Sequence, residues 1–128
     1  MKRQLLFAIF TIMLCACSTC KVTKQSPIQE IQFGNGGGFT GSVETYTLRK
    51  DGHLFTQDKR DIKLSCDSLS AILEIAEQLP KQNFVHPENT YSFVRVLTKN
   101  ETYYYAWSWG DLPDKKVTEL YLKLKNQL

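Results

Sequence analysis

The chain has 128 residues, 42% of them hydrophobic, and a formal net charge of +3 at pH 7. Two of its 16 positive charges lie in residues 1–16, so the other 112 residues carry 14 positive and 13 negative charges, a net charge of +1. A segment of that length can bury one hydrophobic core but not the cores of two domains. Its near-neutral charge excludes the basic surface of a typical nucleic-acid-binding protein, so we expect no nucleic-acid partner.

The first residues are organised like a secretory signal. Lys2 and Arg3 give a basic start, and the run Leu5–Leu14 is apolar except for Thr11. An apolar run of about ten residues is too short to cross a bilayer core of about 30 Å as a helix. We therefore expect residues 1–16 to be a removable signal peptide rather than a transmembrane anchor.

The signal ends in Leu14-Cys15-Ala16-Cys17, which resembles the lipobox of bacterial lipoproteins. Cys17 fits this pattern best, because it has the small Ala16 at −1 and the aliphatic Leu14 at −3. The resemblance implies that Cys17 becomes the N-terminus and carries a thioether-linked diacylglycerol and an amide-linked fatty acid. Several acyl chains would hold the protein durably to a membrane. The alternative is a plain signal peptide cut near Ala16, with unmodified cysteines.

Ser18 follows the proposed acylated cysteine. By resemblance to enterobacterial lipoproteins, an aspartate at that position would favour the inner membrane. We therefore expect a lipid-anchored protein of the cell envelope, in the outer rather than the inner membrane. Residues 17–27 are polar and read as a flexible tether that ends at Pro27, and residues 28–128 are expected to form a single domain.

Two further cysteines, Cys20 and Cys66, remain once Cys15 is removed and Cys17 is acylated. An oxidising periplasm permits a disulfide between them. A bridge requires Cα atoms within about 7 Å of each other. Because Cys20 lies in the tether, we expect an exposed Cys20 and a partly buried Cys66 instead, and the pairing stays open.

Alternating apolar and polar residues predict the strands of the domain. The strands are expected at Ile28–Phe33, Ser42–Lys50, His53–Gln57, Tyr91–Thr98 and Thr102–Trp109. Asp51-Gly52 is typical of a tight hairpin turn. Ile62 and Leu64 alternate with Lys63 and can extend the edge after the third strand.

Helical periodicity predicts two helices. The first, with Asp67 or Ser68 as its cap and Pro80 at its end, has an apolar face made of Leu69, Ile72, Leu73, Ala76 and Leu79. The second, capped by Asp111 or Asp114, has a stripe made of Val117, Leu120, Tyr121, Leu124 and Leu128. Two such helices need a sheet to cover. We predict an α+β fold of order β-β-β-α-β-β-α, with an antiparallel sheet of four or five strands, both helices on one face and the other face partly exposed.

The sequence carries no enzyme signature. Residues 34–41 begin like a dinucleotide-binding loop, but a strand pattern rather than a helix follows them. Cys66 with His53 or His86 is the available Cys-His combination, and their spacing does not bring them together. Two separated histidines without a cysteine pair do not make a zinc site. We therefore expect no catalytic residue, no metal and no cofactor.

The glycine-rich segment holds the candidates for partner binding. Phe39 has few neighbours there, so it either folds onto the end of the sheet or projects toward a partner. The candidate partner-binding residues are Gly36, Gly37, Gly38, Phe39 and Thr40. A second aromatic feature is the stripe of Tyr103, Tyr105, Trp107 and Trp109. We expect most of this stripe in the core, with Tyr104 or Trp109 exposed.

Two resemblances bear on function. The segment Phe33–Gly41, together with Tyr46-Thr47-Leu48, Asp51-Gly52, Asn89-Thr90-Tyr91 and Trp107-Ser108-Trp109, is similar to uncharacterised lipoproteins of Bacteroides-like bacteria. A weaker similarity is to emfourin-type inhibitors of thermolysin-like metalloproteases. Those inhibitors carry Ser-Gly-Gly-Phe-Ala-Gly where this chain has Gly36 in place of the serine and Thr40 in place of the alanine.

The uncharacterised lipoproteins have no known activity to suggest one for this chain. We expect a membrane-tethered, non-catalytic binding module that uses the Gly34–Gly41 loop, with protease inhibition as the form that the weaker similarity suggests and a protease as the protein partner. No inhibitory residue is carried over from the emfourin-type proteins. The alternative is a structural envelope lipoprotein that contacts other envelope proteins and has no discrete ligand site.

Overall fold

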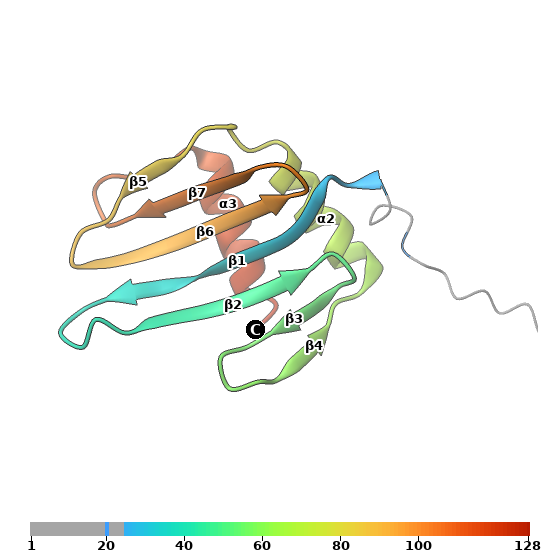
Figure 1. The fold of residues 1–128 in the computed structure, drawn as a ribbon, viewed down its shortest axis with the longest axis horizontal. Helices are drawn as coiled ribbons and strands as arrows, with labels where there is room; N and C mark the ends of the chain where they lie inside the picture. The colour runs from blue at the N-terminus through green and yellow to red at the C-terminus, as the bar shows by residue number, and fades with distance from the viewer. Residues whose placement is uncertain (1–19, 21–24) are drawn as a thin grey trace, which may run out of the picture.

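The computed structural model describes Cys20 and residues 25–128 (Figure 1). The expected signal peptide, the acylated Cys17 and most of the tether lie outside this part of the chain. The elements are β1 (Ile28–Gly37), β2 (Val43–Arg49), β3 (His53–Phe55), β4 (Asp61–Lys63), α2 (Cys66–Glu77), β5 (Phe84–His86), β6 (Thr90–Thr98), β7 (Thr102–Trp107) and α3 (Lys115–Lys125). Among the described residues, none of the helices is long and apolar enough to cross a membrane.

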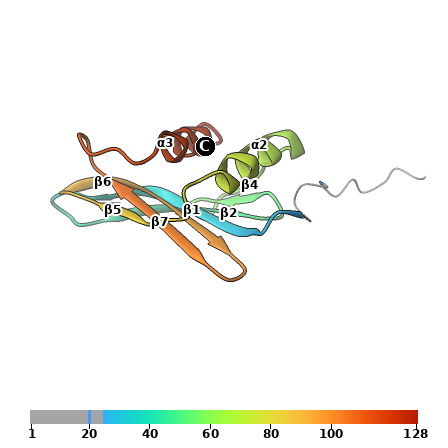
Figure 2. The same ribbon diagram turned by 90° about the horizontal axis from the view of Figure 1, so that it is seen from above.

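The strands form one mixed sheet in the order β4-β3-β2-β1-β6-β7-β5. Both helices lie on the same face of this sheet (Figure 2), which confirms the predicted α+β arrangement. The predicted strand number was wrong, because the sheet has seven strands rather than four or five. It is also not purely antiparallel, because β5 runs parallel to β7.

The additional strands, β4 and β5, lie at the two edges of the sheet. Each has only three residues, so the sequence pattern gives little signal for a separate strand. Ile62, expected to extend the edge after the third strand, does so as part of β4, where it pairs with Leu54 of β3. His86, expected in a loop, pairs with Trp107 as the last residue of β5.

The first strand does not end at Phe33 as expected but continues through the glycines to Gly37. It lies in the middle of the sheet, so both of its edges are paired: Gly34 lies opposite Thr45 of β2 and Phe93 of β6. Hydrogen bonding on two sides outweighs the weak strand preference of glycine. The glycine is also needed for space, because a Cβ at Gly34 would lie 1.8 Å from the backbone oxygen of Glu44.

Both helices begin at side-chain caps. The side chain of Ser65 accepts a hydrogen bond from the backbone N–H of Ser68 at 3.2 Å, so Ser65 caps α2 and the expected caps Asp67 and Ser68 were wrong. Asp114, one of the two residues expected to cap the last helix, accepts from the N–H of Lys116 at 2.8 Å. Each cap satisfies an N–H group that the helix itself leaves unpaired.

The core lies between the two helices and the inward face of the sheet. Ile31 and Phe33 of β1 are 1% and 0% exposed, and they meet helical residues such as Ile72 and Leu120 that are fully buried. The predicted helical stripes are thus confirmed, except that Leu128 at the chain end is 40% exposed. Burial of each such aliphatic or aromatic side chain contributes about 1.5–3 kcal/mol.

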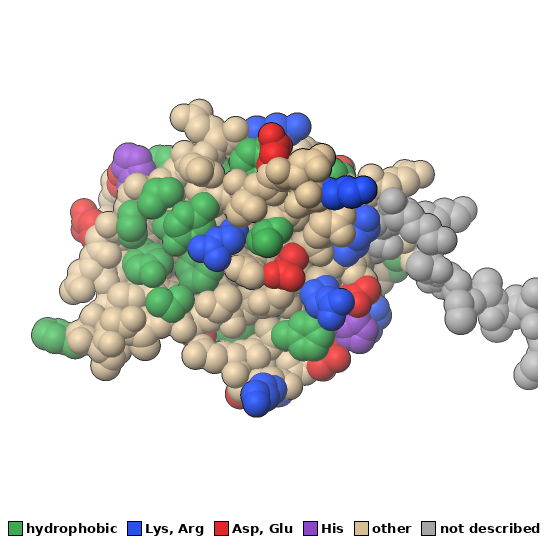
Figure 3. Space-filling model, viewed as in Figure 1, with side chains coloured by type: hydrophobic (Ala, Val, Ile, Leu, Met, Phe, Trp, Pro, Cys, Tyr) green, Lys and Arg blue, Asp and Glu red, His purple; other side chains and the backbone are tan. Residues whose placement is uncertain are grey.

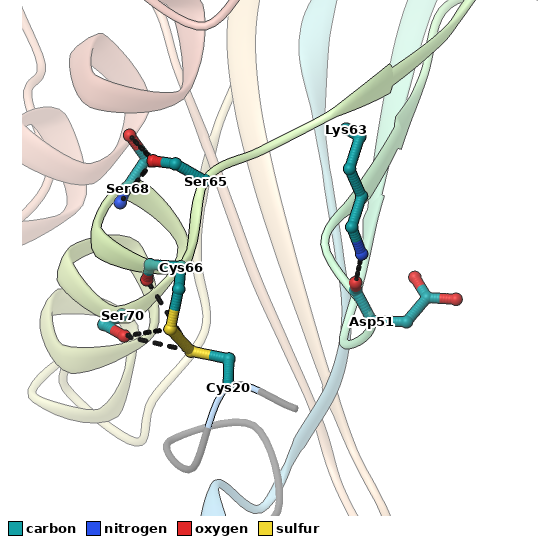
Figure 4. Close-up of a disulfide and its surroundings, with 7 residues drawn as sticks. All are labelled: Cys20, Asp51, Lys63, Ser65, Cys66, Ser68 and Ser70. Carbon is teal, nitrogen blue, oxygen red and sulfur yellow. Dashed lines mark hydrogen bonds between the residues drawn. A yellow bond between two sulfur atoms is a disulfide. The ribbon is translucent and has the colours of Figure 1, made fainter. Parts of the chain in front are cut away.

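Cys20 and Cys66 form a disulfide with a Cα–Cα distance of 5.6 Å (Figure 4). The expectation of an unbridged pair was therefore wrong, because Cys20 lies beside Cys66 at the start of α2. Ser70 Oγ lies 3.4 Å from the sulfur of Cys20. A disulfide sulfur carries no proton, so the Ser70 hydroxyl is the donor in this contact.

The sheet has two distinct ends. The tether end contains the start of β1, the turns at 50–52 and 99–101, and the first turn of α2; there Lys50 Nζ donates to the backbone oxygen of Ser26 at 3.0 Å. The glycine end contains the end of β1 and the loops 38–42, 87–89 and 108–114. These ends lie about 30 Å apart, since β1 has ten residues at about 3.3 Å each.

Candidate functional site

A cavity of about 640 Å³ lies at the glycine end, between α3 and the inward face of the sheet. We call it the groove. Its floor comes from the last inward-facing residues of the central strands, and its wall from α3 and the loop before that helix. Its lining includes Asn35, Glu44, Ser92, Trp107, Trp109, Leu112, Tyr121 and Leu122.

The floor of the groove is polar because the inward-facing residues of three neighbouring strands change from apolar to polar at the same level of the sheet. On β1 the inward residues run from Ile31 and Phe33 to Asn35. Asn35 lies opposite Glu44 of β2 on one side and Ser92 of β6 on the other. The apolar core therefore ends at one line across the sheet, and a row of hydrogen-bonding side chains continues into the groove.

Asn35 is the centre of this polar row. Its side-chain oxygen accepts hydrogen bonds from Ser92 Oγ at 3.2 Å and from the hydroxyl of Tyr121 on α3. Within residues 25–128 no acceptor for its amide nitrogen is found, and the side chain is only partly buried. The two donors fix the orientation of the amide. Asn35 thus keeps N–H groups available for a carbonyl or hydroxyl of a bound molecule.

The wall of the groove is aromatic. Trp107 is 7% exposed and contacts the ring of Tyr121 edge-on, with ring centres 5.3 Å apart. Such an edge-to-face pair is favourable beyond its buried area. Trp107, opposite Ser92 in the sheet, and Tyr121 on α3 therefore form a rigid aromatic side of the groove beside the polar row.

Exposed apolar side chains surround the opening. Trp109 is 96% exposed in the loop after β7, and Leu112 and Leu122 are 60% and 62% exposed. Phe39, at the tip of the β1–β2 hairpin, is fully exposed. Large exposed apolar residues gathered at one end of a small domain indicate a contact surface.

Glu44 supplies a carboxylate at the edge of the floor. The Tyr46 hydroxyl donates a hydrogen bond to it, and this bond, together with burial, raises the pKa of Tyr46 to about 12. The ammonium of Lys125 lies 5.2 Å from the centre of the Tyr46 ring. Tyr46 therefore stays protonated at physiological pH and holds the carboxylate in place.

The loops of the glycine end are held to one another by side chains. Ser108 Oγ accepts from the N–H of Glu88 at 2.7 Å and donates to the backbone oxygen of Thr90 at 2.6 Å. His86 Nδ1 lies 2.8 Å from a carboxylate oxygen of Asp111. These contacts connect the loop before β6 with the loop after β7, so the opening of the groove has defined walls.

The predicted binding residues all lie at the glycine end, but some belong to β1 and others to the hairpin loop. Gly36 and Gly37 belong to β1 and line the groove. Gly37 has a φ of 90°, and its position beside Asn89 leaves no room for a Cβ, which would lie 1.8 Å from the Asn89 oxygen. Gly38, Phe39 and Thr40 form the hairpin loop, and the Thr40 hydroxyl is hydrogen-bonded to that of Ser42 at 3.0 Å. Phe39 projects into solvent rather than folding onto the sheet.

Asn35, Glu44, Ser92 and Tyr121 were not expected as site residues. A signal for three of them exists in the sequence, because Asn35, Glu44 and Ser92 each occupy an inward position at the end of a strand where the alternation otherwise places apolar residues. Tyr121 gives no such signal, since it belongs to an apolar helical stripe. The expected aromatic stripe is divided: Tyr105 and Trp107 are buried, and Trp109 lies beyond the strand end and is exposed.

The open face of the sheet carries a second apolar surface (Figure 3). Its main residues are Phe93, which is 4% exposed, and the partly buried Tyr91 and Tyr104. The guanidinium of Arg95 lies 4.8 Å from the centre of the Tyr104 ring. Burial raises the pKa of Tyr104. We call this surface the open-face patch.

The candidate nucleophile and metal ligands are engaged elsewhere. Cys66 is part of the disulfide and is not a thiol. His53 pairs with Asp61 and His86 with Asp111, in each case at 2.8 Å. In the part of the chain that the structure describes, no group of three or more histidine, cysteine, aspartate or glutamate residues could hold a metal ion.

Comparisons with known proteins found no matching family model, no matching curated protein and no matching solved structure.

Proposed function

We propose that the protein is a membrane-tethered lipoprotein of the cell envelope, outer rather than inner membrane, whose domain binds a protein partner without catalysing a reaction. The acyl chains on Cys17 hold it to the membrane, and the glycine end makes the contact. The observation that carries this proposal is the exposure of Trp109 and Leu112 at a groove whose floor offers fixed hydrogen-bonding groups, with Phe39 exposed at the same end of the sheet. Apolar anchors around oriented polar groups are typical of binding sites.

The partner contact is tested by site-specific photocrosslinking in native membranes. A photoreactive residue in place of Trp109 should give a discrete crosslinked protein. The same residue in place of Asn100, in an exposed turn at the tether end, is the matched control and should not give it. A second probe at Phe39 should capture the same protein. Identical products from positions 109 and 100 would contradict a specific contact at the glycine end.

A protease is the form of this partner that the weaker sequence similarity suggests. The hairpin tip Gly38-Phe39-Thr40 is exposed and well placed to enter a cleft, which supports this form of the proposal. A panel of thermolysin-like proteases is assayed with the soluble domain and with a Phe39→Ala variant. Inhibition that weakens in the variant supports the proposal, and unchanged activity of every protease excludes the inhibitory form.

The open-face patch favours the alternative, a structural envelope lipoprotein that contacts other envelope proteins over a broad surface. Phe93, Tyr91 and Tyr104 occupy a face that neither helix covers. In that case a crosslinker at Tyr104 should capture neighbouring envelope proteins, and crosslinkers at Phe39 and Trp109 should capture none.

A further inference from the structure

We infer that the Cys20–Cys66 disulfide sets the orientation of the domain over the membrane. It holds the tether end against the lipid surface and directs the glycine end away from it. This inference rests on the proposed acylation of Cys17, and it adds a geometry that acylation alone does not give.

The argument begins with the length of the chain between lipid and domain. Without a bridge, ten residue steps separate Cys17 from Pro27, a reach of about 35 Å when extended. A domain on such a tether can tumble and present any face to the membrane. With the bridge, the connection from Cys17 to the folded part is only three residue steps, to Cys20, a reach of about 10 Å.

The point of attachment determines which end of the domain faces the membrane. Cys66 is the first residue of α2, and the bridge joins Cys20 to that helix at the tether end (Figure 4). The segment therefore has two fixed points there, the disulfide and the start of β1, where Ile28 N–H donates to the buried Ser26. A short connection to one end of an elongated domain restricts how far that end can move from the acyl chains.

The opposite end lies beyond the reach of this connection. The groove begins at Asn35 and extends past Gly37, seven and nine residue steps from Ile28, so it lies about 23–30 Å from the tether end. That separation exceeds the reach of the three-residue connection two- to threefold. The groove is thus presented to the aqueous space, where a partner can approach it.

The two tryptophans of the chain make the orientation measurable, because Trp107 and Trp109 both lie at the glycine end. The full-length acylated protein is reconstituted in phosphatidylcholine vesicles that contain a dansyl-labelled lipid, and energy transfer from tryptophan is recorded. A second variant places the donor at the tether end. It replaces both native tryptophans by phenylalanine and introduces a tryptophan in the turn between β6 and β7 (Trp107→Phe/Trp109→Phe/Asn100→Trp). We expect transfer from position 100 to exceed that from the native tryptophans at least about twofold, given the lengths of β1 and of the connection.

A matched variant separates the effect of the length of the connection from any effect of a change in the stability of the fold. A glycine-serine insertion of about six residues between Ser18 and Thr19 keeps the disulfide but adds about 20 Å of reach. It should reduce the difference between the two donor positions, as should Cys20→Ser/Cys66→Ser. Circular dichroism of each variant establishes whether it is folded. If the double serine variant does not fold, the insertion variant alone still tests the inference.

Flotation of the vesicles and the mass of the N-terminal peptide are measured first. Absence of the acyl groups would overturn the proposed anchor and, with it, this inference. Acylated protein that floats but shows equal transfer from both donor positions, with the disulfide intact, would overturn the orientation alone. A difference that the insertion leaves unchanged would also overturn it, because the short connection would then not be the cause.

Discussion

Tyr121 donates a hydrogen bond to the side chain of Asn35, a residue 86 positions earlier in the chain. The bond connects α3 to the central strand of the sheet at the point where the apolar core ends. Ser92 donates to the same oxygen from the neighbouring strand β6. The floor and the wall of the groove are therefore one hydrogen-bonded unit rather than two independent surfaces.

This unit predicts a specific effect of Tyr121→Phe. The variant keeps the ring against Trp107 but removes one of the two donors to Asn35, so the free energy of unfolding should fall by about 1 kcal/mol. Urea denaturation measures it. Tyr103→Phe is the matched control, because its hydroxyl bonds Glu101 near the tether end and is exposed; its effect should be smaller. A larger loss for Tyr103→Phe would contradict the structural importance of the Asn35 contact.

The glycines of β1 should differ in their tolerance to alanine. At Gly34 the added Cβ would meet the backbone oxygen of Glu44 at 1.8 Å, so the sheet itself must move, and we expect a loss of about 3 kcal/mol or more. At Gly36 the nearest atoms, at 2.5 Å, belong to the Tyr91 side chain. That ring can turn away, so Gly36→Ala should cost only about 1 kcal/mol or less.

Thermal unfolding of the two variants tests this order. Equal melting temperatures would show that the approach of β2 to β1 at Gly34 is not as close as described. A Gly36→Ala/Tyr91→Ala double variant tests the second half of the argument, since the Cβ should cost less once the tyrosine ring is removed than it does in its presence.

The sequence predicted the layers of the fold because local periodicity reports burial. Ile31 and Phe33 alternate with polar residues, and Ile72 and Leu120 fall on helical stripes, so their inward orientation could be inferred without knowledge of their partners. The parallel pairing of β5 could not, because Phe84–His86 becomes a strand only where β7 is present beside it. The continuation of β1 through Gly34 likewise depends on having partners on both sides.

The candidate site was predictable only in its location. Gly36, Gly37 and Phe39 lie at the same end of the sheet as the groove. Its central contact, between Asn35 and Tyr121, joins distant segments through a helix-to-sheet packing that no local pattern encodes. The disulfide was missed for a related reason, since the proximity of Cys20 and Cys66, 46 positions apart, is a long-range contact that no local pattern encodes.

Reduction of the disulfide should destabilise the fold as well as lengthen the proposed connection to the membrane. The bridge closes a loop across a sequence separation of 46 residues. Loss of such a cross-link costs up to about 4 kcal/mol in the chain-entropy account. Denaturation of Cys20→Ser/Cys66→Ser with and without a reductant measures this contribution. The reductant should lower the midpoint for the native sequence and leave the double variant unchanged; a shift in the variant would point to another cause.

Stability at alkaline pH should depend on Tyr46. Its hydrogen bond to Glu44 raises the pKa from 10.0 to about 12 in the folded chain. The folded state therefore binds the phenolic proton more tightly than the unfolded state does. This contribution is fully present below pH 10 and is lost as the pH rises through 12. Burial likewise raises the pKa of Tyr105 to about 12, so that residue contributes in the same window.

Tyr46→Phe should reduce the loss of stability between pH 10 and 12, measured by urea denaturation at each pH. Tyr103→Phe is a useful comparison, because the pKa of Tyr103 is also raised by its bond to Glu101, although Tyr103 is only partly buried. An alkaline profile that Tyr46→Phe leaves unchanged would contradict the bond to Glu44.

Alanine at the two tryptophans should separate stability from binding. Trp107 is 7% exposed and packs against Tyr121, so Trp107→Ala should cost about 3–5 kcal/mol. Trp109 is 96% exposed, and Trp109→Ala should leave the free energy of unfolding within about 0.5 kcal/mol of the native value. Crosslinking from a photoreactive residue at Phe39 should nevertheless fall in the Trp109→Ala variant, because the proposed partner would lose an apolar anchor at the opening of the groove. Unchanged crosslinking would remove Trp109 from the contact surface, and a large loss of stability would show that its ring packs against the domain.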